Sequence, residues 1–76
     1  MRQGMLWLDT DKRCSLEDKV RRAAAYYEEK YGQTPNMCLV NKTLLANEKN
    51  LDQIQIRPVR NVALHHFVVG VENSLQ

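Results

Sequence analysis

Residues 15–32 read SLEDKVRRAAAYYEEKYG, and this stretch decides how the rest of the chain must fold. Its apolar side chains recur at steps of three and four residues, which places them in one stripe along an α-helix. Ser15 is suited to cap the first turn, and Gly32 suits the left-handed position that ends a helix before Pro35. The sequence therefore predicts one amphipathic helix from Ser15 to Tyr31, with a single face to bury.

Two short apolar runs flank this helix, MLWL at 5–8 and MCLV at 37–40. Apolar runs of this length, ended by turn-forming residues, are typical of buried strands. A strand, a helix and a second strand in this order make a β-α-β unit. We therefore expect the two strands to run parallel, joined by a right-handed crossover.

The second half of the chain has a stronger strand pattern than helix pattern. Residues 41–50 show only a short helical turn. Ile54 and Ile56 alternate with polar residues, as in a strand with one wet face. Residues 62–71 are rich in β-forming side chains, and a hairpin across residues 58–61 joins these two strands.

Together these elements predict a small single domain of the α/β (α+β) class over residues 5–72. It contains the β-α-β unit, the short helical turn and a C-terminal β-hairpin, and one main helix covers one face of a mixed sheet. Residues 1–4 and 73–76 carry no pattern and are expected to fray. The 76-residue length, with 43% apolar and 26% charged residues, is that of a small globular domain.

The composition also indicates a compartment. No apolar run approaches the roughly 20 residues that cross a bilayer, and Asp9 breaks the first apolar run too early for a secretory signal. Cys14 and Cys38 are not closely spaced, and a small chain with only two cysteines fits a reducing compartment. We therefore expect a cytoplasmic protein with no membrane segment.

One helix leaves the second face of the sheet without cover. In the last predicted strand Leu64, His66 and Val68 point to this second face, while His65 and Phe67 point to the helix. We expect Leu64, His66 and Val68 to lie in an interface with a protein partner, such as a second copy in a homodimer. The alternative is an ordinary surface, since more than half of a protein's surface is apolar.

Asp9 and Asp11 follow the first predicted strand, where ligands bind in open α/β sheets. Two carboxylates could share Mg²⁺, the only cofactor that the sequence suggests, in a metal-assisted hydrolase. The alternative is that both are turn formers whose side chains bond to nearby backbone amides. Cys14 stands just before the helix, where the dipole stabilises a thiolate, but an incidental cysteine is the simpler interpretation.

His65 and His66 are the other residues that attract a chemical interpretation. Adjacent residues in a strand point to opposite faces, so the two cannot readily bind one metal ion together. The simpler interpretation is one buried, hydrogen-bonded histidine beside an exposed one. His66, on the uncovered face, is also a candidate acid–base or interface group.

Basic side chains suggest a second function, a weak nucleic-acid-binding surface. The candidates are Lys12, Arg13, Arg21, Arg22, Arg57 and Arg60. The net charge of +2 and the pI of about 8.7 are low for such a surface, which typically gives a pI above about 9. Glu17 and Asp18 stand four residues before Arg21 and Arg22, which predicts local ion pairs and a merely solvated helix face.

Strong catalytic motifs are absent from the sequence. It has no glycine-rich phosphate loop, no nucleophile elbow and no zinc-binding His-Glu-x-x-His. We therefore expect a non-enzymatic interaction module that self-associates or docks a protein partner. The alternatives are the weak nucleic-acid binder and the metal-assisted hydrolase at Asp9 and Asp11.

Overall fold

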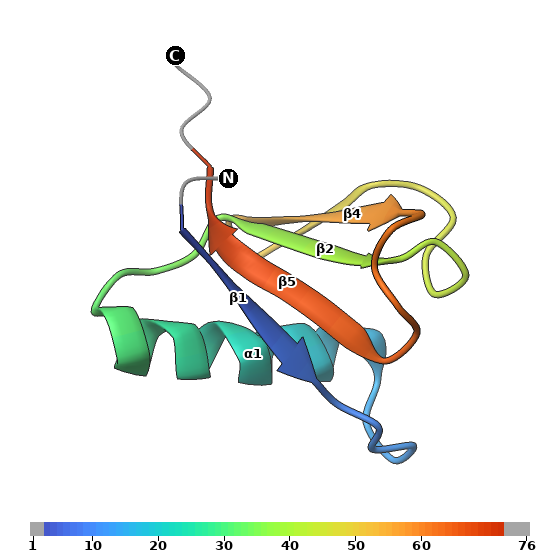
Figure 1. Ribbon diagram of the computed structural model, residues 1–76, viewed down its shortest axis with the longest axis horizontal. Helices are drawn as coiled ribbons and strands as arrows, with labels where there is room; N and C mark the ends of the chain where they lie inside the picture. Colours follow the sequence, from blue (N-terminus) through green and yellow to red (C-terminus); the bar gives the residue numbers. More distant parts are fainter. Residues whose placement is uncertain (1–2, 73–76) are drawn as a thin grey trace.

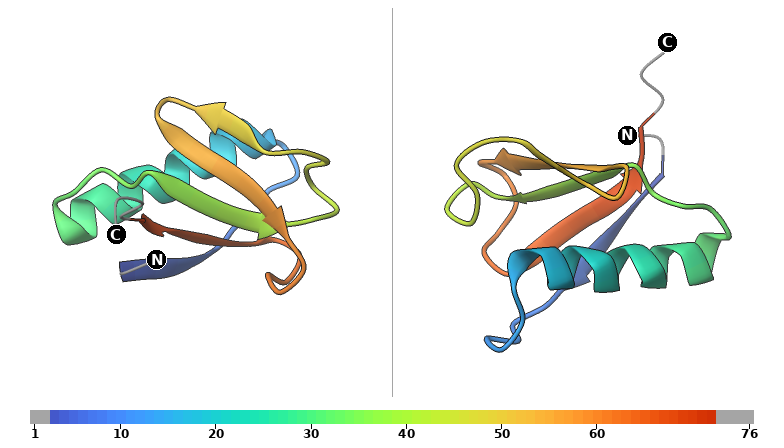
Figure 2. Two further views of the ribbon diagram at one scale, coloured as in Figure 1. Left: turned by 90° about the horizontal axis from the view of Figure 1, so that it is seen from above. Right: turned by 180° about the vertical axis from the view of Figure 1, so that it is seen from behind.

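The computed structural model describes residues 3–72 and contains one helix and one five-stranded mixed sheet (Figure 1). Viewed from above, the sheet lies over the helix, and β1 and β3 stand on opposite sides (Figure 2). This architecture confirms the predicted fold class, a small α+β domain with one helix on one face of a mixed sheet. The elements are β1 Gln3–Leu8, α1 Leu16–Tyr31, β2 Met37–Asn41, β3 Lys49–Leu51, β4 Ile54–Val59 and β5 His66–Val71.

The helix begins and ends where the sequence predicts. The Ser15 hydroxyl oxygen accepts a hydrogen bond from the Asp18 backbone N–H at 3.1 Å, so the first turn is capped. Gly32 has a φ of 69° and donates its N–H to the Glu28 carbonyl at 2.7 Å. The predicted stripe faces the sheet, with Val20, Ala23 and Tyr27 buried.

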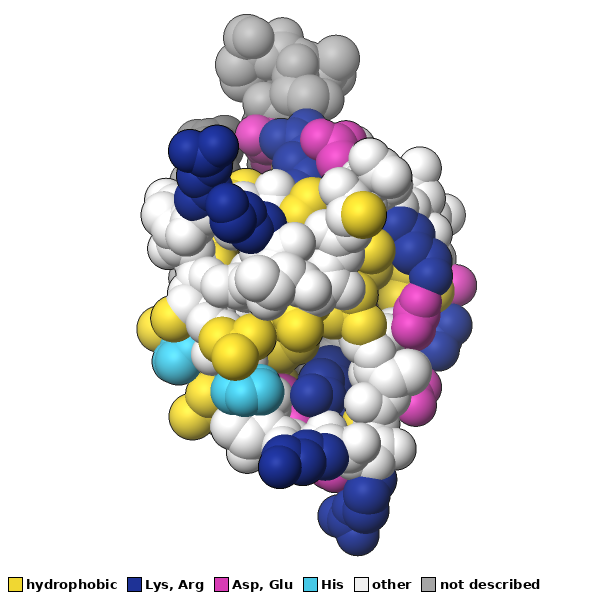
Figure 3. All heavy atoms as spheres, turned by 90° about the vertical axis from the view of Figure 1, so that its right-hand side faces the viewer, with side chains coloured by type: hydrophobic (Ala, Val, Ile, Leu, Met, Phe, Trp, Pro, Cys, Tyr) yellow, Lys and Arg dark blue, Asp and Glu magenta, His cyan; other side chains and the backbone are white. Residues whose placement is uncertain are grey.

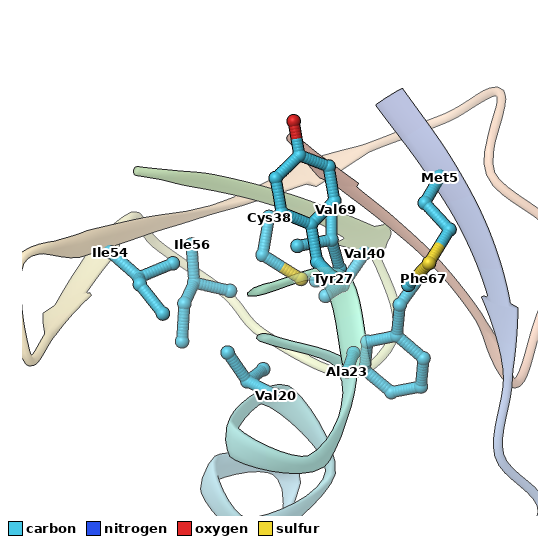
Figure 4. Packing of buried hydrophobic residues seen from close by; sticks show 10 residues of the cluster. All are labelled: Met5, Val20, Ala23, Tyr27, Cys38, Val40, Ile54, Ile56, Phe67 and Val69. Atoms are coloured by element: carbon cyan, nitrogen blue, oxygen red, sulfur yellow. The ribbon is translucent and has the colours of Figure 1, made fainter. Parts of the chain in front are cut away.

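The core lies between α1 and the sheet (Figure 4). Alternate residues of the strands point into it, as the period of two requires. Phe67 and Val69 of β5 are fully buried there, as predicted for the helix-facing side of the last strand. The buried cluster comprises Met5, Val20, Ala23, Tyr27, Cys38, Val40, Ile54, Ile56, Phe67 and Val69.

The strand order is β1-β5-β2-β4-β3. β5 pairs antiparallel with both β1 and β2, so β1 and β2 run parallel, as predicted for the β-α-β unit. They are not neighbours, however, because β5 lies between them. β2 pairs parallel with β4, and β3 pairs antiparallel with β4 at the far edge.

The predicted hairpin across residues 58–61 is wrong, because β2 lies between β4 and β5. The hairpin in this half of the chain joins β3 to β4 instead, with Leu51 opposite Ile54. Asp52 and Gln53 form its two-residue loop with φ values of 50° and 72°, the positive values that tight hairpin turns need. The loop has no glycine to mark it, and β3 is too short for an alternating pattern to show.

The bounds of the other predicted elements also change. A turn replaces the predicted helical turn after β2, with the Leu44 N–H donating to the Asn41 carbonyl at 3.0 Å. β5 begins at His66 and not at residue 62, because a turn closed by the His66 N–H and the Ala63 carbonyl at 3.0 Å precedes it. His65 lies in this turn with a φ of 71°, so it is half-buried and not in the core as the predicted alternation requires.

The strand β1 begins at Gln3, two residues earlier than predicted. Residues 1–4 and 73–76 were predicted to fray. Residues 3 and 4 belong to β1 instead, and positions 1–2 and 73–76 lie outside the described residues. Within residues 3–72 the helix is neither long nor apolar enough to cross a membrane.

Candidate functional site

The sheet face away from α1, here called the open face, is apolar on its β1 and β5 side. Leu6 stands opposite Val68, which in turn stands opposite Leu39 of β2, so three apolar side chains form one row across three strands. Leu8 continues this surface beside His66. Leu6 is 66% exposed and Leu8 58% exposed, while Val68 and Leu39 are half-buried. We call these four residues, Leu6, Leu8, Leu39 and Val68, the apolar patch.

Two of the three predicted interface residues lie on the open face of β5. Val68 is part of the apolar patch, and His66 borders it. Leu64 is 48% exposed and lies in the turn that leads into β5. Its carbonyl is 3.1 Å from the Nδ1 atom of His66, so the imidazole is held beside this turn. Apolar side chains gather beside the two histidines at the lower left of Figure 3. Neither His65 nor His66 belongs to a group of three or more possible metal ligands among the described residues.

The β2 and β4 side of the open face is polar. Arg57 occupies its centre, 3.5 Å from Glu48 and 3.8 Å from Glu72, and its guanidinium also donates to Gln55 at 3.5 Å. A shallow polar pocket of about 220 Å³ lies beside Arg57 on this side of the open face. It is lined by Asn36, Met37, Asn50, Gln53, Gln55, Arg57 and Glu72. The open face is therefore divided into an apolar half and an ion-paired half.

The edge of β1 is unpaired in the described chain. The Asp9 N–H donates to the His65 carbonyl at 3.0 Å, in register with the β1–β5 ladder. Antiparallel partners alternate between bonded and non-bonded pairs, so the backbone groups of Met5 and Trp7 also point to β5. Those of Gly4, Leu6 and Leu8 then point away from the sheet, and no other element described between residues 3 and 72 bonds to them.

The helix side of β1 carries an aromatic pair. The Trp7 and Tyr26 rings lie 4.9 Å apart, centroid to centroid, at 45°. With Arg22, Ala25 and Glu29 they line a shallow groove of about 360 Å³ between the edge strand and α1. The Trp7 Nε1 atom is buried and has no hydrogen-bond partner among the described residues. Both sides of the β1 edge are thus largely apolar.

The carboxylates of Asp9 and Asp11 both contact the Arg22 guanidinium. The Arg22 guanidinium lies 3.5 Å from Asp9 Oδ2 and 3.4 Å from Asp11 Oδ2, and it donates to Cys14 Sγ at 2.9 Å. Asp9 Oδ1 accepts the Asp11 N–H at 3.0 Å, and Asp11 Oδ1 accepts the Arg13 N–H at 2.9 Å. This Arg22 cluster, formed by Asp9, Asp11, Cys14 and Arg22, ties the loop after β1 to the helix.

The electrostatics of the Arg22 cluster are those of a structural contact. Hydrogen bonds from Arg13, the backbone N–H first and the side chain second, lower the pKa of Asp11 to about 2. Desolvation raises the pKa of the Cys14 thiol, which disfavours a reactive thiolate. No group of three or more His, Cys, Asp or Glu side chains that could hold a metal ion occurs among the described residues. The geometry matches the turn-former alternative for both aspartates.

The basic candidates do not gather on one surface. Arg57 lies on the open face, whereas Arg21 and Arg22 lie on the helix across the sheet. Arg21 pairs with Asp18 at 3.6 Å and with Asp52 at 3.2 Å. Lys12, Arg13 and Arg60 are exposed, in the loops that follow β1 and β4; Arg13 also pairs with Asp11 at 3.2 Å.

The predicted ion pairs at spacing four are replaced by other contacts. Glu17 pairs with Lys49 of β3, and Arg22 pairs with the loop after β1. Asp18 pairs at spacing three, with Arg21. The first turns of α1 lie beside β3 and this loop, so tertiary partners compete with those on the helix surface.

Sequence reasoning named Leu64, His66 and Val68 but not the two most exposed members of the apolar patch. Leu6 and Leu8 alternate with Met5 and Trp7 in an uncharged strand, and this pattern was the available signal. Comparison of the chain with known protein families, with curated proteins and with solved structures finds no match.

Proposed function

We propose that this chain is a non-enzymatic interaction module that associates with a protein partner through the apolar patch. The observation that carries the proposal is the pair of leucines, Leu6 and Leu8, which are 66% and 58% exposed on an edge strand. Val68 and Leu39 extend them into a continuous apolar row. Contiguous exposed apolar surface on a small domain is typical of an interaction site.

Burial of the exposed leucines contributes part of the free energy of association. Full burial of an exposed leucine contributes about 1.5–3 kcal/mol. Two leucines on each side of an interface therefore supply a substantial part of the free energy of a micromolar complex, about −8 kcal/mol. The divided open face also favours this function, because its ion-paired half would remain solvated at the rim of such an interface.

The alternative functions have less support. Four of the six basic candidates, Arg13, Arg21, Arg22 and Arg57, already face carboxylates. Phosphate binding would have to compete with these internal partners. At Asp9 and Asp11 the Arg22 guanidinium occupies the position that a cation would take.

The test is the molar mass in solution, measured by size-exclusion chromatography with light scattering. We expect a mass above the 8.9 kDa of one chain, and a return to one chain in Leu6→Asp and in Leu8→Asp. Leu44→Asp is the matched control, because Leu44 is 37% exposed in the turn after β2 and outside the patch. Folded patch variants that keep the mass of the unmodified protein would contradict the proposal.

A further inference from the structure

We infer that the partner is a second copy of this chain, and that the two copies join along β1 into one continuous sheet. The pairing is antiparallel and two-fold, so that each β1 strand completes the edge of the other. This inference depends on the proposed function, because it names the partner and joins the two copies along the strand that carries Leu6 and Leu8. It is carried by three properties of β1: its free backbone groups, its side-chain shape and its lack of charge.

The free backbone groups fix the register. Gly4, Leu6 and Leu8 direct their N–H and C=O groups outward, as the Asp9–His65 bond and the ladder alternation require. An antiparallel neighbour satisfies all three only if Leu6 stands opposite Leu6 of the second copy. Gly4 then stands opposite Leu8 of the second copy, and Leu8 opposite Gly4. Each of these three pairs exchanges two hydrogen bonds.

The side chains of the open face fit this register. Gly4 stands opposite Gly70 of β5, so two neighbouring strands carry no side chain at this level of the sheet. The long Leu8 side chain of the second copy would lie over this bare strip. The two Leu6 side chains would meet at the two-fold axis, and the two apolar patches would become one surface. On the helix side Met5 would stand opposite Trp7, beside the Trp7–Tyr26 pair.

The β1 edges of two copies can approach because β1 carries no charge, whereas charged residues oppose the same contact at β3. No charged residue occurs from Gln3 to Leu8. β3 is only three residues long, carries Lys49 and is flanked by Glu48 and Asp52. Short length and charge are the features that protect sheet edges from pairing. Self-association through β1 also closes after two copies, because a two-fold contact uses the same strand on both sides.

The interface is small, so the dimer is expected to dissociate on dilution. Edge pairing orders one strand and a few flanking side chains per copy, which places the buried area at the low end for specific complexes, below about 1,200 Å². The measurements must therefore cover a wide range of protein concentration.

The sharpest test removes one outward hydrogen bond without changing any side chain. Cys14 permits ligation of a synthetic peptide covering residues 1–13 to the remainder of the chain. We would place an N-methyl group on the Leu6 amide, which blocks the edge but leaves the bonds from β1 to β5 intact. The matched control carries the N-methyl group on the exposed Lys12, whose N–H has no partner among the described residues.

We expect the unmodified chain and the Lys12 control to form concentration-dependent dimers, and the Leu6 form to be a folded monomer by circular dichroism and sedimentation. A folded Leu6 form that dimerises like the control overturns the edge geometry. In that case the proposed function still stands if Leu8→Asp gives a monomer. It falls as well if the unmodified chain is a monomer at every concentration.

A cross-linking experiment covers the case in which the N-methylated chain does not fold. In a Cys14→Ser background, Leu6→Cys places the new thiol of one copy opposite the same thiol of the second copy. Their Cα atoms would be about 5.5 Å apart, within the range for a disulfide. We expect Leu6→Cys to yield disulfide-linked dimers under mild oxidation, and Leu44→Cys to yield few. Cys38 is fully buried, so it does not compete. Equal yields from the two variants would overturn the inference.

Discussion

β1 and β3 are the two edge strands of the same sheet, and they differ in length, charge and cover. β3 has three residues, and its Lys49 pairs with Glu17 on the helix, so its edge carries charged side chains on a short strand. β1 has six residues without charge, and Leu6 and Leu8 are largely exposed along it. Protein chains normally protect their sheet edges by the means seen at β3. Within residues 3–72, folding of a single copy therefore leaves β1 as the unprotected edge.

The open face repeats this contrast. Its β4 side holds Arg57 among carboxylates, and such a surface is stable in water without a partner. Its β1 side holds the apolar patch, where Leu6 and Leu8 lose contact with water when a partner packs beside or over them. The unpaired strand edge and the two most exposed residues of the apolar patch thus belong to the same strand, β1. The presence of both features on one strand is the reason for assigning association to β1.

The largest effect on dimerisation is expected when β1 is given a charged side chain like the one that β3 carries. Leu6→Lys places two like charges against each other at the two-fold axis, where juxtaposed charges cost several kcal/mol. We expect dimerisation to weaken by at least about 100-fold, as measured by sedimentation equilibrium. The thermal unfolding of the monomer should change little, because Leu6 lies outside the core. A variant that dimerises as well as the unmodified chain would show that β1 is not the interface.

The next largest effect concerns the loop that anchors the end of β1. Arg22→Ala leaves the buried Asp9 carboxylate, 6% exposed, without its cationic partner. Because Arg22 itself is about half exposed, we expect a loss of about 1–2 kcal/mol in the free energy of unfolding, less than for a fully buried pair. Arg57→Ala is the control and should cost under about 1 kcal/mol. Urea unfolding in which the two variants lose equal stability would contradict a special role of the Arg22 cluster.

The same loop should show a pH dependence at acid pH. The pKa of Asp11 is lowered from 3.8 to about 2 in the folded chain, so its contribution to stability is complete above pH 3.8 and is lost as the pH falls toward 2. Asp11→Asn should therefore reduce the decline in stability over this range, as followed by unfolding at a series of pH values. Glu29→Gln, at an exposed helix position with no ion pair among residues 3–72, should preserve the decline. Identical pH profiles for Asp11→Asn and the unmodified chain would contradict the assignment.

The smallest effect is expected at the already protected edge. Lys49→Leu removes the charge from β3 and its pair with Glu17, which should cost under about 1 kcal/mol of stability. Because β3 remains only three residues long, we expect no oligomer larger than a dimer by light scattering. Formation of larger oligomers would show that charge, and not length, protects this edge.

The parts of the fold that local chemistry controls could be predicted from the sequence. Ser15 and Gly32 mark the ends of the helix, and the period of two in the strands assigned Phe67 and Val69 to the core. Strand order could not be predicted in this way. The insertion of β5 between β1 and β2 depends on long-range pairing, and neither of these apolar strands specifies its neighbours by pattern.

The candidate site was predictable in part for the same reason. The uncovered sheet face follows from one helix and several strands, and it led to Val68 and His66. The position of β1 at the edge depends on the strand order, which the sequence does not specify. Leu6 and Leu8 therefore could not be ranked above Val68 and His66 as interface residues. Arg22 was expected to pair along the helix, but its partners come from a loop whose path the sequence does not specify.

The most direct test of edge pairing is amide hydrogen exchange of β1, measured by NMR at low and high protein concentration. The Met5 and Trp7 amides bond to β5 and should be protected at both concentrations. The Leu6 and Leu8 amides should exchange rapidly in the dilute protein and become protected as the dimer forms. If they still exchange rapidly in a concentrated sample that is dimeric by mass, β1 is not paired with a second copy and the account is wrong.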